Sequence, residues 1–459
     1  MKPVSAACET RDSPLARILA SSQPGAVAFV CEEYYRDSGE TGTSSVSLLA
    51  IHVPEPEAES HYCVVTDQLE EARAWLATNT LSRSSLPSLA RLLAAPLLDL
   101  RAPWRLEPVY IPKPWGQEIW YTGIERRGQS RVGDGVHSLP LPWLLALSPD
   151  GLLLPGVREP ALLKILDPLA EEVFGDLYFE LHEEKREVYV VTHVDKQAWP
   201  GGEGAIRFGF DQALRSEFAD DDDFRQAFLQ AVANYETVRR AIDNHCDGLR
   251  EAAGIDLNEP VDAATLKGWL ATVPEELTTR ERAARQAMNR FTHMLPLRVG
   301  DVVKVPCLTP HALQHGVRTV EFQTPVYERQ ILSFAQKVLT QSHWDTERAV
   351  TLMDLGAGDF EPLELLAADD SLRLERIVGF SDFEVLRLTL QAGARWTQQA
   401  SEHYSLVMVV EGSPTVSGQP CRAEDALLVP RCAAKPVIDA GSEQGAVVLV
   451  CLPVAAESL

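Results

Sequence analysis

Two short stretches of the sequence carry imidazole and carboxylate side chains at spacings that suit a metal ion. The first contains Glu180, His182 and Glu187, and the second, residues 300–311, ends on His311. Successive side chains of a strand point to opposite faces, so Glu180 and His182 are expected on one face. We expect Glu187 on the neighbouring antiparallel strand, close enough to share an ion. His311 would complete the site from a distant strand pair.

Imidazole combined with carboxylate suits zinc, manganese or iron(II). The alternative interpretation is a salt-bridged hairpin with an unrelated loop histidine. Two other histidines are not expected to be ligands. His193 shares the strand face of Glu187 but lies six residues further on, so we expect it inside the barrel or behind the ligands. His315 is expected in a turn.

Local patterns predict strands on both sides of a long helical stretch. Residues 177–182 and 187–194 alternate as strands do, and further strands follow the helical stretch. Within that stretch, Phe224, Phe228 and Val232 recur at four-residue spacing, which predicts one buried helical face. The acidic residues just before them are expected at the solvated start of this helix.

The charge of the chain limits its partners. The 459 residues carry a formal net charge of −24, which argues against nucleic acids and anionic membrane surfaces as partners. No run of about 18 apolar residues would form a membrane span, and no secretory signal is recognisable. The eight cysteines show no CxxC spacing, so we expect reduced thiols and a cytoplasmic protein.

A chain of this length holds roughly two to four domains. The patterns predict a mainly β fold with an α insertion and an N-terminal α/β unit. The expected divisions are residues 1–105 for an N-terminal domain of unknown function, 106–211 and 296–340 for the metal-binding domain, 212–295 for a helical insertion, 344–371 for a linker, and 371–459 for a C-terminal β-rich domain.

The spacing Glu-x-His-x4-Glu, followed by Gly-x5-Pro-x4-His, resembles the two motifs of the cupin superfamily. Within it, the chain resembles the type I phosphomannose isomerases (mannose-6-phosphate isomerases). The segments that carry the likeness are Lys113-Pro114-Trp115-Gly116, residues 162–167, Glu180-Leu181-His182, Lys185-Arg186-Glu187, residues 305–313 and Glu321-Phe322-Gln323. The likeness covers residues 106–340 well, the C-terminal region weakly and residues 1–105 not at all.

This resemblance implies cupin-like jelly-roll barrels and an isomerase that interconverts mannose 6-phosphate and fructose 6-phosphate, with a phosphorylated sugar as its partner. It also implies one divalent metal ion, which we expect to be zinc. The implied metal ligands are Glu180, His182, Glu187 and His311. Lys185 resembles a substrate-binding lysine and Glu321 an acidic catalytic residue. Arg329 resembles an arginine that is both catalytic and substrate-binding.

Two departures from the family keep a second function open. Glu180 replaces a glutamine and adds negative charge beside the ion, and Tyr178 replaces a serine that helps to hold phosphate. The alternative is a catalytically altered cupin that binds a metal and a sugar or sugar phosphate in a binding or regulatory role. In the C-terminal region Lys435 occupies the position of a ligand histidine, which predicts a metal-free cupin-like domain. The unmatched residues 1–105 suggest a protein partner.

Overall fold

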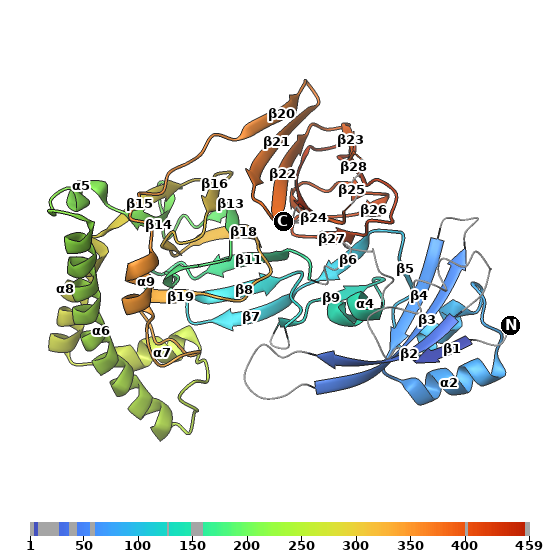
Figure 1. Ribbon diagram of the computed structural model, residues 1–459, viewed down its shortest axis with the longest axis horizontal. Helices are drawn as coiled ribbons and strands as arrows, with labels where there is room; N and C mark the ends of the chain where they lie inside the picture. Colours follow the sequence, from blue (N-terminus) through green and yellow to red (C-terminus); the bar gives the residue numbers. More distant parts are fainter. Residues whose placement is uncertain are drawn as a thin grey trace. The chain divides into compact units, whose positions relative to one another are not determined.

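The computed structural model describes residues 4–7, 27–35, 44–55, 60–125, 128–147, 159–399 and 403–454 (Figure 1). The chain divides into two compact units. The first comprises residues 1–109, 120–163 and 363–459, and the second comprises residues 110–119 and 164–362. Residues 120–163, which the sequence analysis grouped with the metal-binding strands, thus cluster with the first unit. No helix in the described ranges is long and apolar enough to cross a membrane.

Two sheets in the second unit share one hydrophobic core. The six-stranded sheet has the order β16 (Val302–Val305), β13 (Glu187–Val194), β18 (Val317–Gln323), β11 (Leu162–Pro168), β8 (Gly116–Trp120) and β7 (Val109–Lys113). The five-stranded sheet has the order β15 (Thr292–Leu297), β14 (Gly204–Phe210), β17 (His311–Leu313), β12 (Phe179–Leu181) and β19 (Gln330–Ser333). Leu181 of β12 and Tyr189 of β13 both contribute to the core. The mainly β fold with a helical insertion is confirmed.

Strand β13 has the bounds that its alternation predicts, but a bulge changes its far end. Its pairing with β18 is regular from Glu187 to Val191, and the register then shifts between Val191 and His193. The extra residue of a bulge reverses the alternation that follows it, and His193 is exposed. The prediction that His193 lies inside the barrel is therefore wrong, whereas the prediction that His315 lies in a turn is confirmed.

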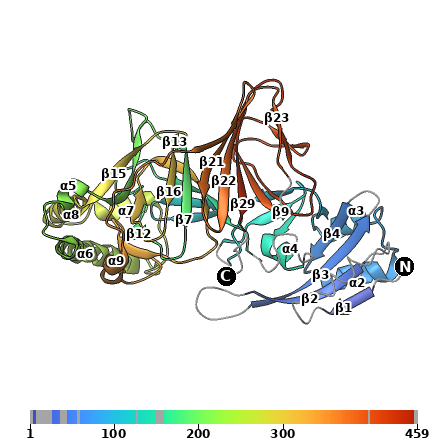
Figure 2. The same cartoon turned by 45° about the horizontal axis from the view of Figure 1, so that its top comes forward.

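The helical insertion is built on the long helix α6. Its helices are α5 (Gln212–Arg215), α6 (Asp221–Ala252), α7 (Ala263–Leu270) and α8 (Glu275–Asn289). Phe224, Phe228 and Val232 form a buried face of α6, as predicted. The Asp220 carboxylate caps α6 by accepting from the Asp223 backbone N–H at 2.9 Å. Helices α6 and α8 pack side by side (Figures 1 and 2).

The stretch predicted as a linker contains regular structure. Helix α9 (Thr346–Leu352) packs against β19 and α6, and strand β20 (Glu364–Ala368) joins a sheet of the first unit. Thr346, Ala349 and Val350 are the buried residues of α9. A seven-residue helix with so short an apolar face is hard to recognise by periodicity alone.

The N-terminal part of the first unit is an α/β arrangement. Its sheet has the order β1 (Val4–Ala7), β2 (Val27–Tyr35), β3 (Ser44–Glu55), β4 (Ser60–Thr66) and β5 (Leu98–Asp99). Strands β1 and β2 are parallel, and the other neighbours are antiparallel. Helices α2 (Leu69–Thr78) and α3 (Leu86–Leu92) bury Ala72, Leu86 and Leu89 in the same core as Leu49 and Ile51 of β3.

The rest of the first unit joins segments that are far apart in the sequence. A nine-stranded sheet has the order β10 (Ser138–Pro140), β9 (Arg131–Gly133), β6 (Trp104–Glu107), β27 (Ala426–Val429), β24 (Ser405–Glu411), β29 (Ala446–Pro453), β22 (Phe383–Leu390), β21 (Leu372–Gly379) and β20. A small sheet has the order β23 (Arg395–Thr397), β28 (Val437–Asp439), β25 (Thr415–Val416) and β26 (Gln419–Pro420). Helix α4 (Leu141–Leu147) follows β10. Arg105 of β6 forms an ion pair with Asp425 at 2.7 Å.

Gly116, at the start of β8, occupies a position that only glycine fits. Its φ is +146°, and a Cβ atom added there would lie 2.3 Å from the Asp167 carbonyl oxygen. We predict that Gly116→Ala lowers the free energy of unfolding by about 2 kcal/mol or more, because a glycine-only conformation is combined with a backbone clash. Urea unfolding measures the loss. Gly135→Ala is the control, since Gly135 also has a positive φ but open space around it. Equal losses in both variants would contradict the clash argument.

Candidate metal centre

The predicted metal ligands come from both sheets of the second unit. Glu180 on β12 lies opposite His311 on β17 in an antiparallel pair, and His182 directly follows β12. Glu187 begins β13, which pairs with β16 and β18. The prediction that Glu187 lies on a strand paired with that of Glu180 is therefore wrong. The turn between β12 and β13 passes from one sheet to the other, so the ligands face one another across the core instead of along a hairpin.

The ligand atoms lie close together. Glu180, His182 and His311 each offer one atom, and these atoms all lie within 4.8 Å of one another. The Glu187 carboxylate bridges the two imidazoles, with Oε1 3.3 Å from His182 Nε2 and Oε2 3.1 Å from His311 Nε2. His182, Glu187 and His311 are only 1%, 2% and 2% exposed. The structure thus brings all four predicted ligands together, three of them buried and Glu180 partly buried.

Both imidazoles are oriented so that Nε2 faces the carboxylates. His182 Nδ1 lies 2.9 Å from the Glu328 carbonyl oxygen, and His311 Nδ1 lies 3.0 Å from that of Thr309. A carbonyl oxygen only accepts, so in the neutral rings each Nδ1 carries the hydrogen and each Nε2 presents a lone pair. His182 Nε2 and Glu180 Oε2 are buried without a hydrogen-bond partner. Lone pairs that converge in this way are complemented by a cation, and the donor set fits a divalent metal ion.

The charges of the cluster shift the pKa values of its members. Burial would lower the pKa of His311, but the hydrogen bond and charge of Glu187 outweigh burial and raise it. Burial and the Lys185 ammonium lower the pKa of His182. Burial would raise the pKa of Glu187, but Lys185 and His182 hold it well below its usual range. Lys185 Nζ lies 2.8 Å from Glu187 Oε1, and the Tyr189 hydroxyl donates to Glu187 Oε2 at 2.6 Å.

The other predicted site residues lie around this cluster. Glu321 on β18 is buried, and its Oε2 lies 3.2 Å from Lys164 Nζ. Burial and the charge of Glu187 raise the pKa of Glu321 well above its usual range. Arg329 Nη1 lies 3.9 Å from Glu180 Oε2, and its guanidinium lies 4.6 Å from the centre of the Tyr178 ring. Lys185, Glu321 and Arg329 therefore all surround the four ligands.

Three further charged residues belong to this surround, although sequence reasoning did not single them out as functional. Lys164 lies on β11, and its pKa is raised because Glu321 and other carboxylates outweigh burial. Lys113 Nζ lies 3.1 Å from Glu118 Oε2, and burial lowers the pKa of Lys113. The sequence did hold a sign that Lys164 has a role, because it is a lysine within the apolar run 162–166. A lysine in such a run is expected to be buried, and a buried lysine is rare without a partner. Lys113 belongs to a segment that carries the family likeness, but no local pattern marks Glu118.

Comparisons with known proteins show a likeness at the level of structure. No family model matches the chain, and no curated protein matches it. Among solved structures, the chain is similar to the mannose 6-phosphate isomerase from Bacillus subtilis, with a TM-score of 0.52 and 14% identity over 76% of this chain and 99% of that chain. It is also similar to a variant of the phosphomannose isomerase from Salmonella typhimurium, with a TM-score of 0.49 and 12% identity over 77% of this chain and 100% of that chain. The first likeness establishes the fold.

Proposed function

We propose that this protein is a metal-dependent aldose–ketose isomerase that interconverts mannose 6-phosphate and fructose 6-phosphate. One observation carries the proposal. Two imidazole Nε2 atoms and two carboxylates lie close together in a largely buried cluster, with cationic side chains beside it. The fold is similar to that of a mannose 6-phosphate isomerase. One fold can host several functions, so the chemistry of the site carries more weight than the fold.

The proposed ion is held by Glu180, His182, Glu187 and His311, and zinc is the ion we expect. When bound, such an ion polarises a sugar carbonyl and orients two sugar oxygens. The backbone carbonyls of Glu328 and Thr309 hold the two imidazoles in their ligating orientation. Glu180 adds a second carboxylate to the ligand set, which favours tight binding of a divalent cation.

The charges around the ion suit a phosphorylated sugar. The surrounding pairs are Lys113 with Glu118, Lys164 with Glu321, Lys185 with Glu187, and Arg329 with Glu180. These formal charges cancel, so a divalent ion leaves a double positive charge, and a phosphate group brings about −1.5 to −2. Once Glu180 and Glu187 act as ligands, Lys185 and Arg329 become available to bind substrate.

Glu321 is the proposed acid–base group. Both of its carboxylate oxygens are buried without a hydrogen-bond partner, and Lys164 lies beside it. A raised pKa allows this carboxyl group to take a proton from one of C1 and C2 and return it to the other, through an enediol. The guanidinium of Arg329 would stabilise the negative charge that develops on the enediol oxygens.

Formation of fructose 6-phosphate from mannose 6-phosphate tests the proposal directly. We predict turnover by the zinc-loaded protein and a loss of more than about 100-fold after chelation, because carbonyl polarisation supplies several kcal/mol of the barrier reduction. Added zinc should restore the rate. A folded protein that contains one zinc ion per chain and shows no turnover would remove the isomerase proposal.

A binding or regulatory role is the second candidate. The Arg329 guanidinium already contacts the Tyr178 ring, and this contact competes with the phosphate of a substrate. Saturable binding of mannose 6-phosphate without turnover would select this role.

The protein partner of residues 1–105 stays a prediction. A pull-down that compares the full chain with a chain lacking these residues tests it.

A further inference from the structure

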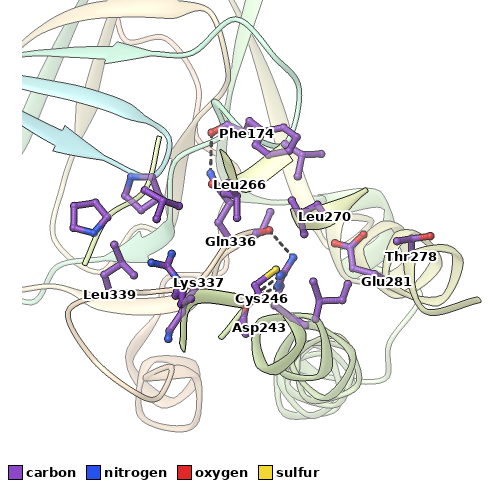
Figure 3. A pocket seen from close by; sticks show the side chains of 18 of the residues that line it. Phe174, Asp243, Cys246, Leu266, Leu270, Thr278, Glu281, Gln336, Lys337 and Leu339 are labelled. Carbon is purple, nitrogen blue, oxygen red and sulfur yellow. Dashed lines mark hydrogen bonds and ion pairs between the residues drawn. The ribbon is translucent and has the colours of Figure 1, made fainter. Parts of the chain in front are cut away.

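A cavity of about 270 Å³ lies in the helical insertion, and none of the metal-centre residues lines it (Figure 3). Its walls come from helices α6, α7 and α8 and from the segments 172–174 and 335–339. Figure 3 shows the side chains of Cys246, Leu266 and Leu270 around the same space as Gln336 and Lys337. Apolar side chains therefore share this space with charged and amide groups.

Arg250, which also lines the cavity, shares its nearest carboxylate with another cation. Its side chain is 4% exposed, and its Nε atom is buried without a hydrogen-bond partner. The nearest carboxylate oxygen, Asp247 Oδ1, lies 3.8 Å from Nε. Lys337 Nζ holds both oxygens of Asp247, at 2.7 and 2.8 Å. A buried guanidinium without a close counter-charge is costly, and a carboxylate is its best geometric complement.

The acidic residues on the cavity wall do not neutralise Arg250. Asp243 forms an ion pair with Arg239 at 2.8 Å, and Glu281 forms one with Arg285 at 3.1 Å. Glu172, the other lining carboxylate, is exposed to solvent. One buried positive charge is thus left over, which matches a single negative charge on a ligand and not the double charge of a phosphate.

The guanidinium of Arg250 is held in place before any ligand arrives. Its Nη1 donates to the Glu259 carbonyl oxygen, and its central carbon lies 5.4 Å from the centre of the Trp269 ring. Both contacts restrict the rotamers of a long side chain, whose loss of freedom would otherwise oppose binding. The site is therefore preorganised for a carboxylate.

Gln336 supplies a second unsatisfied group. It is 4% exposed, and its Nε2 donates to the Phe174 carbonyl oxygen at 2.8 Å. Since a carbonyl only accepts, this bond fixes which end of the amide is nitrogen. The Oε1 atom then remains buried without a hydrogen-bond partner. It requires a donor such as a hydroxyl group.

The cavity is large enough for an organic acid. An empty cavity of about 150 Å³ already accommodates benzene, so about 270 Å³ leaves room for a small apolar body and its polar substituents. Val173, on the wall, has a φ of +72°. This conformation is rare for a β-branched residue, and such strain is concentrated at ligand-binding sites.

We propose that this cavity binds a small monocarboxylic acid whose apolar body carries a hydroxyl group. Arg250 binds the carboxylate, Gln336 Oε1 accepts from the hydroxyl, and Ile242, Leu266 and Leu270 contact the apolar body. No bond is made or broken, so the site is a binding site for an effector and not a second catalytic centre.

Isothermal titration calorimetry with 4-hydroxyphenylacetate tests the proposal on the full chain. We expect one molecule to bind per chain, and the neutral 4-hydroxyphenylacetamide to bind at least about 10-fold more weakly, because a hydrogen bond to a charged group is lost. Phenylacetate, which lacks the hydroxyl, should bind about 2- to 10-fold more weakly. Equal affinities for acid and amide, or no binding of the acid at millimolar concentration, would overturn the proposal.

Variants locate the acid within the molecule. Arg250→Met should remove the preference for acid over amide, whereas Arg282→Met, the same change at an exposed position of α8, should keep it. Gln336→Leu should remove the preference for 4-hydroxyphenylacetate over phenylacetate. This variant tests the cavity site even if Arg250→Met does not fold. His311→Ala should bind the acid as the parent does. An altered affinity in that variant would place the acid at the metal centre and refute the cavity site, independently of whether the isomerase proposal holds.

Discussion

Alanine in place of His311 should remove the divalent ion and abolish turnover. His311 Nε2 is one of two imidazole donors that face Glu187, from a side chain that is 2% exposed. Water cannot easily replace such a donor in a buried site. Loss of a group that only positions a ligand already costs about 10- to 100-fold in metal affinity, so loss of a ligand should cost at least about 100-fold. Metal content after dialysis and the initial rate of fructose 6-phosphate formation are the measurements.

His315→Ala is the matched control for this prediction. His315 is also a buried histidine, but its Nδ1 bonds Asp176 at 2.7 Å and its ring stacks on Trp199 with centroids 4.7 Å apart. We expect this variant to lose stability and keep its metal. Equal metal content in the parent and in His311→Ala would remove His311 from the ligand set. Loss of metal from both variants would point to a general loss of structure, which their melting temperatures would reveal.

The sequence predicted well the features that depend on neighbouring residues. The alternation of residues 187–194 gave the bounds of β13, and the spacing of Phe224, Phe228 and Val232 gave the buried face of α6. Both patterns repeat over short distances, so they need no knowledge of the rest of the chain. The four ligands also come together as the two motifs suggested, because each motif places its polar residues at strand ends.

The features that sequence reasoning missed depend on distant contacts. No local pattern shows that Glu180 and Glu187 lie in different sheets, since a tight hairpin and a sheet-to-sheet connection both use a short polar turn. The bulge beyond Val191 depends on the partner strand β18. The pairing of β6 with β27 joins residues more than 300 positions apart, and no periodicity within either strand indicates it.

Lys164→Met tests how much the ion pair between Lys164 and Glu321 contributes to the stability of the fold. The side chains of Lys164 and Glu321 are 9% and 1% exposed, and the two charges lie 3.2 Å apart. Removing the ammonium leaves a buried carboxyl group without its cation. We predict that the free energy of unfolding of the metal-free protein falls by about 3–5 kcal/mol near pH 8. Denaturant unfolding of the parent and the variant in a chelating buffer gives the difference.

The loss caused by Lys164→Met should depend on pH and on Glu321. Burial and Glu187 already raise the pKa of Glu321, and removing Lys164 raises it further. A carboxyl group whose folded pKa is raised binds its proton more tightly when folded, so its stabilisation is present at low pH and is lost as pH rises through the folded pKa. The defect should therefore be smallest near pH 5 and grow above neutrality. The double variant Lys164→Met/Glu321→Gln should recover about 1–3 kcal/mol of it, because no buried charge is then left unpaired. A defect that is the same at every pH, or that the second substitution makes worse, would show that Lys164 contributes through packing and not through its charge.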